Sequence, residues 1–482
     1  MTVIDPFFMN VLKSEAPGST PRTLSIVIPT ITRPGRPFDV RLAALDVDGY
    51  PSVECNLPVT FDPSDGFQPP GPPVFRSGRP AVAVAEGAEL NAPGLHRLAV
   101  RLGDDLFYSN PTLCTDDDRP GIYWGDPHVH TLLSRCVYWY ARSLNFAYVA
   151  GRYVTGLDWM AVADHVSNGR CDPAIWNDQR MTCHAFNDPG RFATVLGYEA
   201  SFKGGAGGDN NVYFAGDCDL YVDDFDEGSV KTLCQKLGAR EFIAVPHHTS
   251  RPGKHGEITD DIYPNPRLMP VVEIHSKWGT SEYRGNPDGL ADTHDGPSFV
   301  QDFLASGKMF GFIGGTDTHA TMPSGGGIES PHISHRPGMT AILGDELTRR
   351  EIFKRMVRRH CYATAGERIF LDVSVTDSET DIPMGEYAEC RDGRAPRTVK
   401  VTAAGCTAIA RVEIVRNNAV VHTEEPGDWK TEFEWTDTEP LKQIAYDPSR
   451  HIRRPFVYYY VRVTCRSGAK AWSSPIWTLD AS

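Results

Sequence analysis

The sequence predicts an α/β fold in which a parallel sheet or barrel lies between two β-sandwich-like domains. Between residues 120 and 365, strand-like apolar runs alternate with helical segments, and this alternation is typical of parallel sheets and βα-barrels. Residues 1–119 and 366–482 contain instead short runs rich in Val, Leu and Ile, separated by Pro and Gly. At 482 residues the chain is too long for one core. We therefore expect three domains with these boundaries.

The two flanking domains are predicted from their strand-like runs. The first carries "TLSIVIPT", "VRLAALDVDG" and "AVAVAEGAEL", and the last carries "RTVKVTAAG", "ARVEIVRNNAVVHTE" and "FVYYYVRVTC". Asn417 and Asn418 lie between two of these runs and favour a hairpin turn. Neither flank contains a cluster of polar residues that is typical of an active site.

The middle domain contains four segments with helical patterning. In the last of them Thr348 and Glu351 have the spacing of a capping box, and Arg358 and Arg359 suit the helix C-terminus. The four predicted helices span residues 138–153, 228–238, 297–307 and 346–360.

Composition and charge exclude several classes of protein. The formal net charge of −14 argues against a nucleic-acid-binding surface, which needs a basic field. No run approaches the roughly 20 apolar residues of a membrane helix, and the first 20 residues lack the features of a signal peptide. The eleven cysteines are scattered and contain no CxxC pair, so we expect a cytoplasmic protein without a disulfide framework.

The strand-like runs of the middle domain end in one chemical class of residue. "YWGDPHVHT" places two histidines at positions 128 and 130, and residues two apart in a strand point the same way. In βα-barrels the functional residues gather at the C-terminal ends of the strands. Twelve of the 16 histidines lie between residues 128 and 335. The candidate ligands at the strand ends are His128, His130, His165, Glu199, His247, His275, Asp317 and His319.

This residue set predicts a metal centre. Imidazole and carboxylate ligands together suit divalent zinc, manganese or iron, and the absence of thiolates disfavours a structural zinc site. A carboxylate such as Glu199 can bridge two ions, and a water shared by two metals becomes a hydroxide nucleophile near neutral pH. A single histidine at a strand end is more often an ordinary hydrogen-bonded residue. The repeated placement is what favours metal binding.

Further residues are candidates for catalysis and for substrate binding. Asp164 or His248 could move a proton to the leaving group. The cations Arg135, Arg251, Lys254, Lys277 and Arg284 follow the strand ends in loops and could bind an anionic substrate, although a single such residue is more often a solvated surface charge. Arg135 is also a candidate catalytic residue, together with Asp164 and His248.

The motifs "DPHVHT", "ADH", "GYE", "PHH" and "TDTH", in this order, resemble those of the PHP (polymerase and histidinol phosphatase) superfamily of metal-dependent hydrolases. More closely, the chain resembles a large PHP-like branch with flanking β domains. The resemblance covers about residues 120–370. It implies a distorted (β/α)7 barrel with two or three metals, whose ligands match His128, His130, His165, Glu199, His247, Asp317 and His319. Superfamily members with three metals often have an acidic residue or histidine after the first motif; here Arg135 and Cys136 stand there, which leaves a third metal open.

The resemblance and the residues together predict a metal-dependent hydrolase that uses a metal-bridged hydroxide. The phosphoesterases of the superfamily point to a phosphoester or a related small-molecule bond. The alternatives are a carbamate, ester or amide hydrolase, a metal-dependent lyase on the same fold, and a non-catalytic metal-binding protein. The expected partner is a small molecule, for which the loop cations favour an anion, with neither nucleic acid nor membrane involved.

Overall fold

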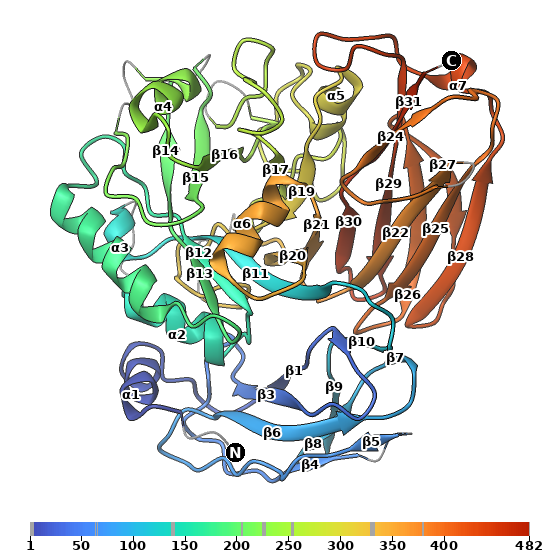
Figure 1. Ribbon diagram of the computed structural model, residues 1–482. Coiled ribbons are helices and arrows are strands. Elements are labelled where there is room, and N and C mark those ends of the chain that lie inside the picture. The colour runs from blue at the N-terminus through green and yellow to red at the C-terminus, as the bar shows by residue number, and fades with distance from the viewer. Residues whose placement is uncertain are drawn as a thin grey trace.

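The structure is a computed structural model of the 482-residue chain and describes residues 4–62, 64, 66–135, 140–203, 206–223, 228–251, 255–327, 333–377 and 380–481. It is mostly β structure, with 38% of the residues in strands and 14% in helices. Figure 1 shows the N-terminal region in blue below the middle region, and the C-terminal strands in orange and red beside it. None of the described helices is long and apolar enough to cross a membrane.

The N-terminal region is a helix followed by three small sheets. Their strand orders are β1-β3-β6-β5, β2-β10-β7 and β4-β8-β9. Buried Val40, Leu42, Val100 and Leu102 belong to a core that these sheets share. The elements are α1 (Pro6–Glu15), β1 (Thr23–Val27), β2 (Ile31–Thr32), β3 (Phe38–Leu45), β4 (Val59–Phe61), β5 (Phe67–Gln68), β6 (Val82–Leu90), β7 (Gly94–His96), β8 (Ala99–Leu102), β9 (Asp105–Tyr108) and β10 (Thr112–Cys114).

The middle region mixes parallel and antiparallel pairing. β11, β12 and β13 are parallel, β14-β15-β16 is an antiparallel meander, and β17 is parallel to β19. The elements are β11 (Gly121–Val129), the short 3-10 helix η1 (Leu132–Ser134), α2 (Leu144–Tyr153), β12 (Trp159–Val162), α3 (Pro173–Phe186), β13 (Ala193–Val195), β14 (Gly197–Ser201), β15 (Asp209–Phe214), α4 (Val230–Leu237), β16 (Phe242–Pro246), β17 (Val271–Ser276), β18 (Gly279–Thr280), α5 (Val300–Ala305), β19 (Gly311–Gly314), β20 (Gly338–Gly344), α6 (Arg349–Val357) and β21 (Cys361–Ala365).

The predicted fold class, an α/β (β/α)7 barrel with flanking β-sandwich domains, is wrong. The strands of the middle region that the structure describes are divided among three sheets, and six of them, β14, β15, β16, β18, β20 and β21, form only antiparallel ladders. One physical reason is β15, which begins with the polar residues Asp209, Asn210 and Asn211 and so lacks the apolar signal of a strand. It separates β14 from β16, which were expected to be parallel neighbours.

Local signals in the sequence predicted helix positions better than they predicted the sheets. α2, α4, α5 and α6 lie within the four predicted helical segments, although residues 138–139 of the first segment are outside the described residues. Thr348 caps α6, since its hydroxyl accepts a hydrogen bond from the backbone N–H of Glu351 (3.2 Å). α3 was not predicted.

The C-terminal region continues the sheet of the middle region. β11, β20 and β21 are joined through β30 to β29, β26 and β27 in one 11-stranded sheet, which therefore crosses the expected boundary at residue 365. A second sheet has the order β23-β22-β25-β28. The elements are β22 (Phe370–Asp377), β23 (Thr380–Pro383), β24 (Tyr387–Cys390), β25 (Arg397–Ala404), β26 (Ile409–Arg416), β27 (Ala419–Glu424), β28 (Lys430–Asp437), α7 (Leu441–Ile444), β29 (Phe456–Cys465), β30 (Lys470–Ser473) and β31 (Ile476–Asp480).

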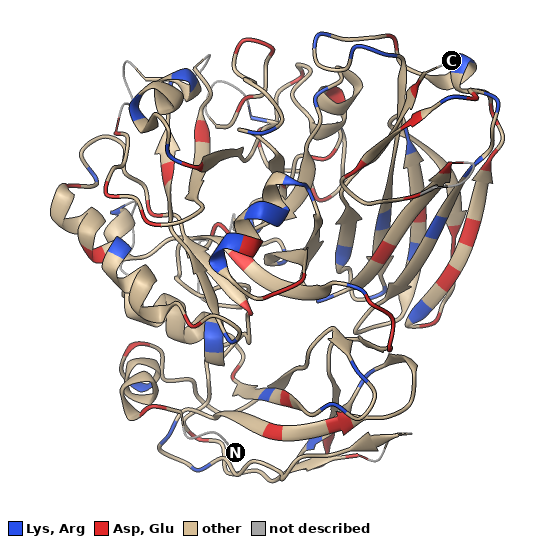
Figure 2. Cartoon of the chain, in the orientation of Figure 1, with Lys and Arg blue, Asp and Glu red and all other residues tan. Residues whose placement is uncertain are grey.

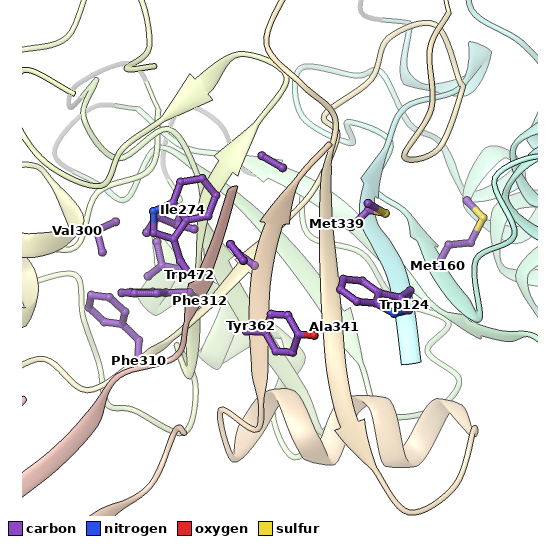
Figure 3. Packing of buried hydrophobic residues seen from close by; sticks show 14 of the residues in the cluster. Trp124, Met160, Ile274, Val300, Phe310, Phe312, Met339, Ala341, Tyr362 and Trp472 are labelled. Atoms are coloured by element: carbon purple, nitrogen blue, oxygen red, sulfur yellow. The ribbon is translucent and has the colours of Figure 1, made fainter. Parts of the chain in front are cut away.

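A common hydrophobic core joins the middle and C-terminal regions. Trp124 of β11 packs edge-on against Tyr362 of β21, with ring centroids 5.6 Å apart. Figure 3 shows these two side chains in line with Trp472 of β30 and Phe312 of β19. All four are fully buried, so separating the two regions would expose a large aromatic surface to water.

A buried carboxylate, Glu282, also links these regions. It follows β18 and accepts hydrogen bonds from Tyr460 (2.7 Å), Arg462 (2.6 Å) and the indole N–H of Trp472 (2.8 Å). Its side chain is 0% exposed. A buried carboxylate with three donors from two neighbouring strands holds β29 and β30 against the middle region.

Replacing Glu282 by leucine is expected to lower the free energy of unfolding by about 3–5 kcal/mol, because the change leaves buried donors without an acceptor. Arg462 would keep its second partner, Glu413. Denaturant unfolding measures the change. The control is Glu425→Gln, a change at an exposed position. If the denaturant midpoint of unfolding of Glu282→Leu equalled that of this control, the structural role of Glu282 would be contradicted.

The N-terminal region contacts the loop that follows the predicted last ligand. The backbone N–H of Gly327 donates to the carbonyl of Asp48 (2.6 Å), and a Cβ on Gly49 would lie 2.9 Å from Gly326 Cα. Glu15 of α1 accepts hydrogen bonds from the backbone and hydroxyl of Ser143, the N-cap of α2. The N-terminal region thus fixes backbone on the side of the molecule where the candidate ligands lie.

Candidate metal centre

Most of the predicted ligands meet in one buried cluster. His128 is on β11, and His130 follows it by two residues, as strand alternation predicts. His165 pairs with Glu199 of β14 through an isolated parallel bridge. His247 follows β16 directly, and Asp317 and His319 follow β19. The cluster residues are His128, His130, His165, Glu199, His247, Asp317 and His319, joined by Asp209 of β15.

Four donor atoms in this cluster have the spacing of ligands around one ion. His128 Nε2 and His130 Nε2 are 3.2 Å apart. Asp317 Oδ1 is 3.0 Å from His130 Nε2 and 3.4 Å from His128 Nε2. Glu199 Oε2 is 3.3 and 3.5 Å from the same two nitrogens. Donor atoms about 2.0–2.2 Å from a tetrahedral ion lie roughly 3.3–3.5 Å apart, so this set fits a divalent cation.

Glu199 has the geometry of a bridging carboxylate. While its Oε2 faces His128 and His130, its Oε1 faces His247 Nε2 at 3.4 Å. Glu199, Asp209 and His247 form a second set of possible ligands, and His130, His165 and His319 form a third. His165 Nδ1 is buried and has no hydrogen-bond partner among the described residues, although it lies 3.4 Å from Glu199 Oε2. A buried imidazole nitrogen without a hydrogen bond, close to a carboxylate oxygen, is the arrangement that a cation bound to both atoms would satisfy.

Asp209 is a possible ligand that the sequence did not reveal. It opens β15, where Ser201 of β14 pairs with it. Its Oδ2 accepts a hydrogen bond from His255 Nδ1 (2.6 Å), which orients the carboxyl group. Asp209 lies in a stretch of Gly, Asp and Asn that is typical of a loop, and recognising its role required the pairing of β14 with β15.

The electrostatics favour the ligand protonation states of Glu199, Asp317, His165 and His319. At His128 and His247 burial alone would lower the pKa, but the neighbouring carboxylates raise it above its usual value. Burial alone would raise the pKa of the Glu199 carboxyl, but His165 and His247 hold it well below its usual range. Burial likewise opposes the charge on Asp317, whose pKa is nevertheless lowered by His128, His130 and His248. Burial lowers the pKa of His165 to about 4 and that of His319 to about 3. Both imidazoles are therefore neutral at pH 7, the form in which a histidine binds a metal.

The backbone around the cluster is held in an unusual conformation. Asp317 and His248 have positive φ angles of 51° and 52°, which cost energy for residues other than glycine and occur mainly where surrounding contacts enforce them. Asp126 supplies several such contacts: its carboxylate accepts from the backbone N–H groups of His128 (3.1 Å), Thr316 (3.0 Å) and Ser324 (2.8 Å). It ties the end of β11 to the turn that carries Asp317.

Glu273 supports the cluster from outside. This buried residue of β17 accepts from His128 Nδ1 at 3.0 Å, while His130 Nδ1 lies 3.0 Å from the Ser134 hydroxyl. A carboxylate behind a ligating imidazole fixes the ring and makes its other nitrogen a stronger donor. His128 is therefore expected to bind a cation more tightly than His130.

The prediction of His275 as a metal ligand is wrong. Its Nε2 donates to the carbonyl oxygen of Arg336 (2.9 Å), and its ring stacks on Trp472, with centroids 5.5 Å apart. Strand alternation would place Glu273 and His275 on one face, but the register of β17 against β19 shifts between them. The irregularity turns His275 away from the cluster, and it leaves Glu273 as the residue of this strand that faces a ligand.

The two predicted proton carriers lie in different settings. Both carboxylate oxygens of Asp164 accept from Thr131, at 2.6 Å each from its backbone N–H and hydroxyl. Asp164 therefore holds the turn after His130, and a direct role in proton transfer is not supported. His248 Nε2 lies 2.9 Å from Asp317 Oδ2, and burial lowers its pKa to about 3. It is neutral at pH 7 and in direct contact with a candidate ligand.

The cations predicted to bind the substrate differ in their burial. Lys277 is buried, with Nζ 3.5 Å from the carbonyl of Gly326, and Arg251 is half-buried three residues after His248. Arg284 is exposed and donates to the carbonyl of Gly296 (2.9 Å), and its role as a substrate ligand stays a prediction. Arg135 is exposed and forms the C-cap of η1. Cys136 and Lys254 lie outside the described residues.

Replacing Glu273 by glutamine is expected to weaken metal binding about 10–100-fold, the usual cost of losing the partner behind a ligating histidine. Competition with a coloured chelator measures the affinity. His275→Gln, two residues along the same strand, is the matched control and should bind metal like the parent. Equal affinity in the two variants would remove Glu273 from the support of the centre.

Comparisons with known proteins leave the family open. No protein-family model matches the chain. An uncharacterized protein of Chlamydia pneumoniae is 29% identical over 412 residues, covering 80% of this chain and 62% of the relative. An uncharacterized protein of Chlamydia trachomatis is 27% identical over 418 residues with the same coverage. The chain thus spans about 62% of the length of these relatives.

Solved structures add no evidence on fold or function. An FMN-binding β-glucuronidase from Facaelibacterium prausnitzii is 8% identical, with 96% of this chain and 74% of that chain covered and a TM-score of 0.19. A Bacteroides uniformis β-glucuronidase is also 8% identical, with 96% and 62% covered and a TM-score of 0.21. These scores are too low to define a common fold.

Proposed function

We propose that this protein is a metal-dependent hydrolase with two divalent ions, zinc, manganese or iron, in the cluster around Glu199. The observation that carries the proposal is the Glu199 carboxylate, whose two oxygens face different sets of imidazoles at 3.3–3.5 Å. Bound there, the ions would lower the pKa of a coordinated water and polarise the bond under attack. The resemblance of the ligand motifs to PHP hydrolases agrees with this reading.

The proposal gives the residues of the chain separate roles. His128, His130 and Asp317 would hold one ion, and His247 and Asp209 the other, with Glu199 between them. His165 and His319 could hold a third ion together with His130. Closed structural sites are usually rich in cysteine, whereas every member of this cluster is a histidine or a carboxylate, which favours a catalytic role.

His248 is the proposed proton carrier. It is buried beside Asp317, with Nε2 2.9 Å from its Oδ2, and from this position it could pass a proton from the attacking water to the leaving group. Arg251 and Lys277 follow the strands that end at the cluster. They suit an anionic substrate, and a phosphoester is the first class to test. We also propose a cytoplasmic location, which rests on the ten free cysteines among the described residues.

Removal of metal is expected to abolish turnover and leave most of the fold intact, because the large apolar cores lie outside the cluster. The purified protein would be treated with a chelator, reloaded with zinc, manganese or iron, and assayed on phosphomonoesters, phosphodiesters, carboxylic esters and carbamates. Circular dichroism on the same samples reports folding. A rate that chelation does not change, or a stripped protein that unfolds, would contradict a catalytic centre.

A further inference from the structure

A cavity of ligand size lies away from the metal centre. Its volume is about 480 Å³, within the range of small-molecule sites. It lies between α6, the turn after α4, the start of β16 and the segment before β17, with Phe242, Leu268 and Phe353 among its lining residues. Phe242 is the first residue of β16 and His247 follows its last, so roughly 16 Å of extended strand separates the cavity from the cluster.

The cavity combines an apolar floor with a basic rim. Phe353 is buried, and Phe242, Leu268 and Val357 are half-buried. Arg350, Lys354 and Arg358 follow one another at intervals of four residues, which places them along one side of α6. Figure 2 shows this basic stretch of α6 in blue. Arg240, from the turn after α4, and Arg267, from the segment before β17, bring the cations of the rim to five.

The ion pairs of the rim leave two of its cations available. Arg350 pairs with Glu241 (3.0 Å), Lys354 with Glu351 (3.0 Å) and Arg240 with Asp219 (3.1 Å). Within the described part of the chain, no ion pair involves the side chains of Arg267 and Arg358. Two exposed guanidinium groups on one apolar cavity, in a chain whose net charge is −14, mark a local site for an anion.

We propose that this cavity binds a small amphipathic anion, in which an aromatic or aliphatic body carries a sulfonate, phosphate or carboxylate group. The body would pack on Phe242, Leu268 and Val357, and the anionic group would bind Arg267 and Arg358, whose planar donors suit such oxygens. A long polyanion fits less well, because Glu241 and Asp219 interrupt the basic rim. The site is separate from the proposed hydrolase centre and does not depend on it.

Fluorescence titration of the full-length, metal-loaded protein with anilinonaphthalene sulfonate tests the proposal, since this probe joins an aromatic body to one anionic group. The double variant Arg267→Glu/Arg358→Glu is expected to bind it at least about tenfold more weakly, equivalent to about 1.4 kcal/mol. The matched control is Arg394→Glu, a charge reversal at an exposed position outside the cavity, which should bind like the parent. The uncharged phenylnaphthylamine should bind the parent more weakly than the sulfonate.

A cavity-filling variant, Val357→Trp, checks the position of the probe independently of charge. Tryptophan on this side of α6 would occupy the apolar floor and should weaken the binding of both probes. The proposal is overturned if the double variant binds the sulfonate like the parent, if Arg394→Glu weakens binding as much as the double variant, or if folded Val357→Trp retains full affinity.

Discussion

Glutamine at position 199 is expected to remove one of the two metals and most of the activity. Glu199→Gln keeps the size of the side chain and one oxygen but loses the negative charge that both cations would share. In the parent, histidines hold the pKa of this carboxyl well below its usual range, so the charge is present throughout the neutral range. The amide nitrogen of glutamine cannot bind a cation, so one of the two bridging contacts disappears.

Elemental analysis and rate measurement on the same preparation test this expectation. Metal content should fall by about one ion per chain, and thermal stability should fall only by the loss of metal linkage. Glu425→Gln makes the same chemical change at an exposed position and should alter neither quantity. If Glu199→Gln kept the parental metal content and rate, the two-metal mechanism would have to be abandoned.

Replacing Asp317 by asparagine is expected to reduce turnover at least on the order of 10²-fold, the scale of losing one electrostatic stabiliser in an active site. Asp317 Oδ1 lies 3.0 Å from His130 Nε2, and its Oδ2 contacts His248 at 2.9 Å. One change therefore affects both a ligand and the setting of the proposed proton carrier. Asparagine is preferred to alanine because it tolerates the positive φ of 51° at this position.

The control for Asp317→Asn is His275→Gln, which alters a strand-end histidine that the structure removes from the cluster. Its rate should stay close to that of the parent. Parental turnover in Asp317→Asn, with metal content unchanged, would exclude Asp317 from the centre and leave the contact with His248 as a purely structural one.

Strand alternation and ligand chemistry predicted most members of the histidine and carboxylate cluster around Glu199 from the sequence. His128 and His130 converge because residues two apart share a face. Glu199 lies on a buried strand and Asp317 follows another by three residues, and both meet the two histidines. Asn417 and Asn418 form the predicted hairpin turn, with φ angles of 49° and 69°. Each of these features depends on only a few neighbouring residues.

Features that depend on pairing between distant segments could not be predicted. The prediction of a barrel was wrong because the polar start of β15 gives no sequence signal of a strand. In the structure β15 pairs with β14 on one side and with β16 on the other. The prediction that His275 is a ligand was wrong because the register of β17 against β19 shifts between Glu273 and His275, so the two side chains do not share a face. Asp209 and Glu273 lie near the ligands only through those same pairings. The cavity beside α6 joins three separate segments and has no local signal.

The pairing of β21 with β30 has a consequence for how the chain is made. Ala365 pairs with Lys470 and Tyr362 with Ser473, so β21 must wait for more than 100 residues before its partner is synthesised. At about 5–20 residues per second this interval lasts roughly 5–20 s. During it, the growing polypeptide exposes an apolar strand edge of the kind that attracts other chains. Production of this protein should therefore depend on translation speed and on chaperones that shield nascent strands.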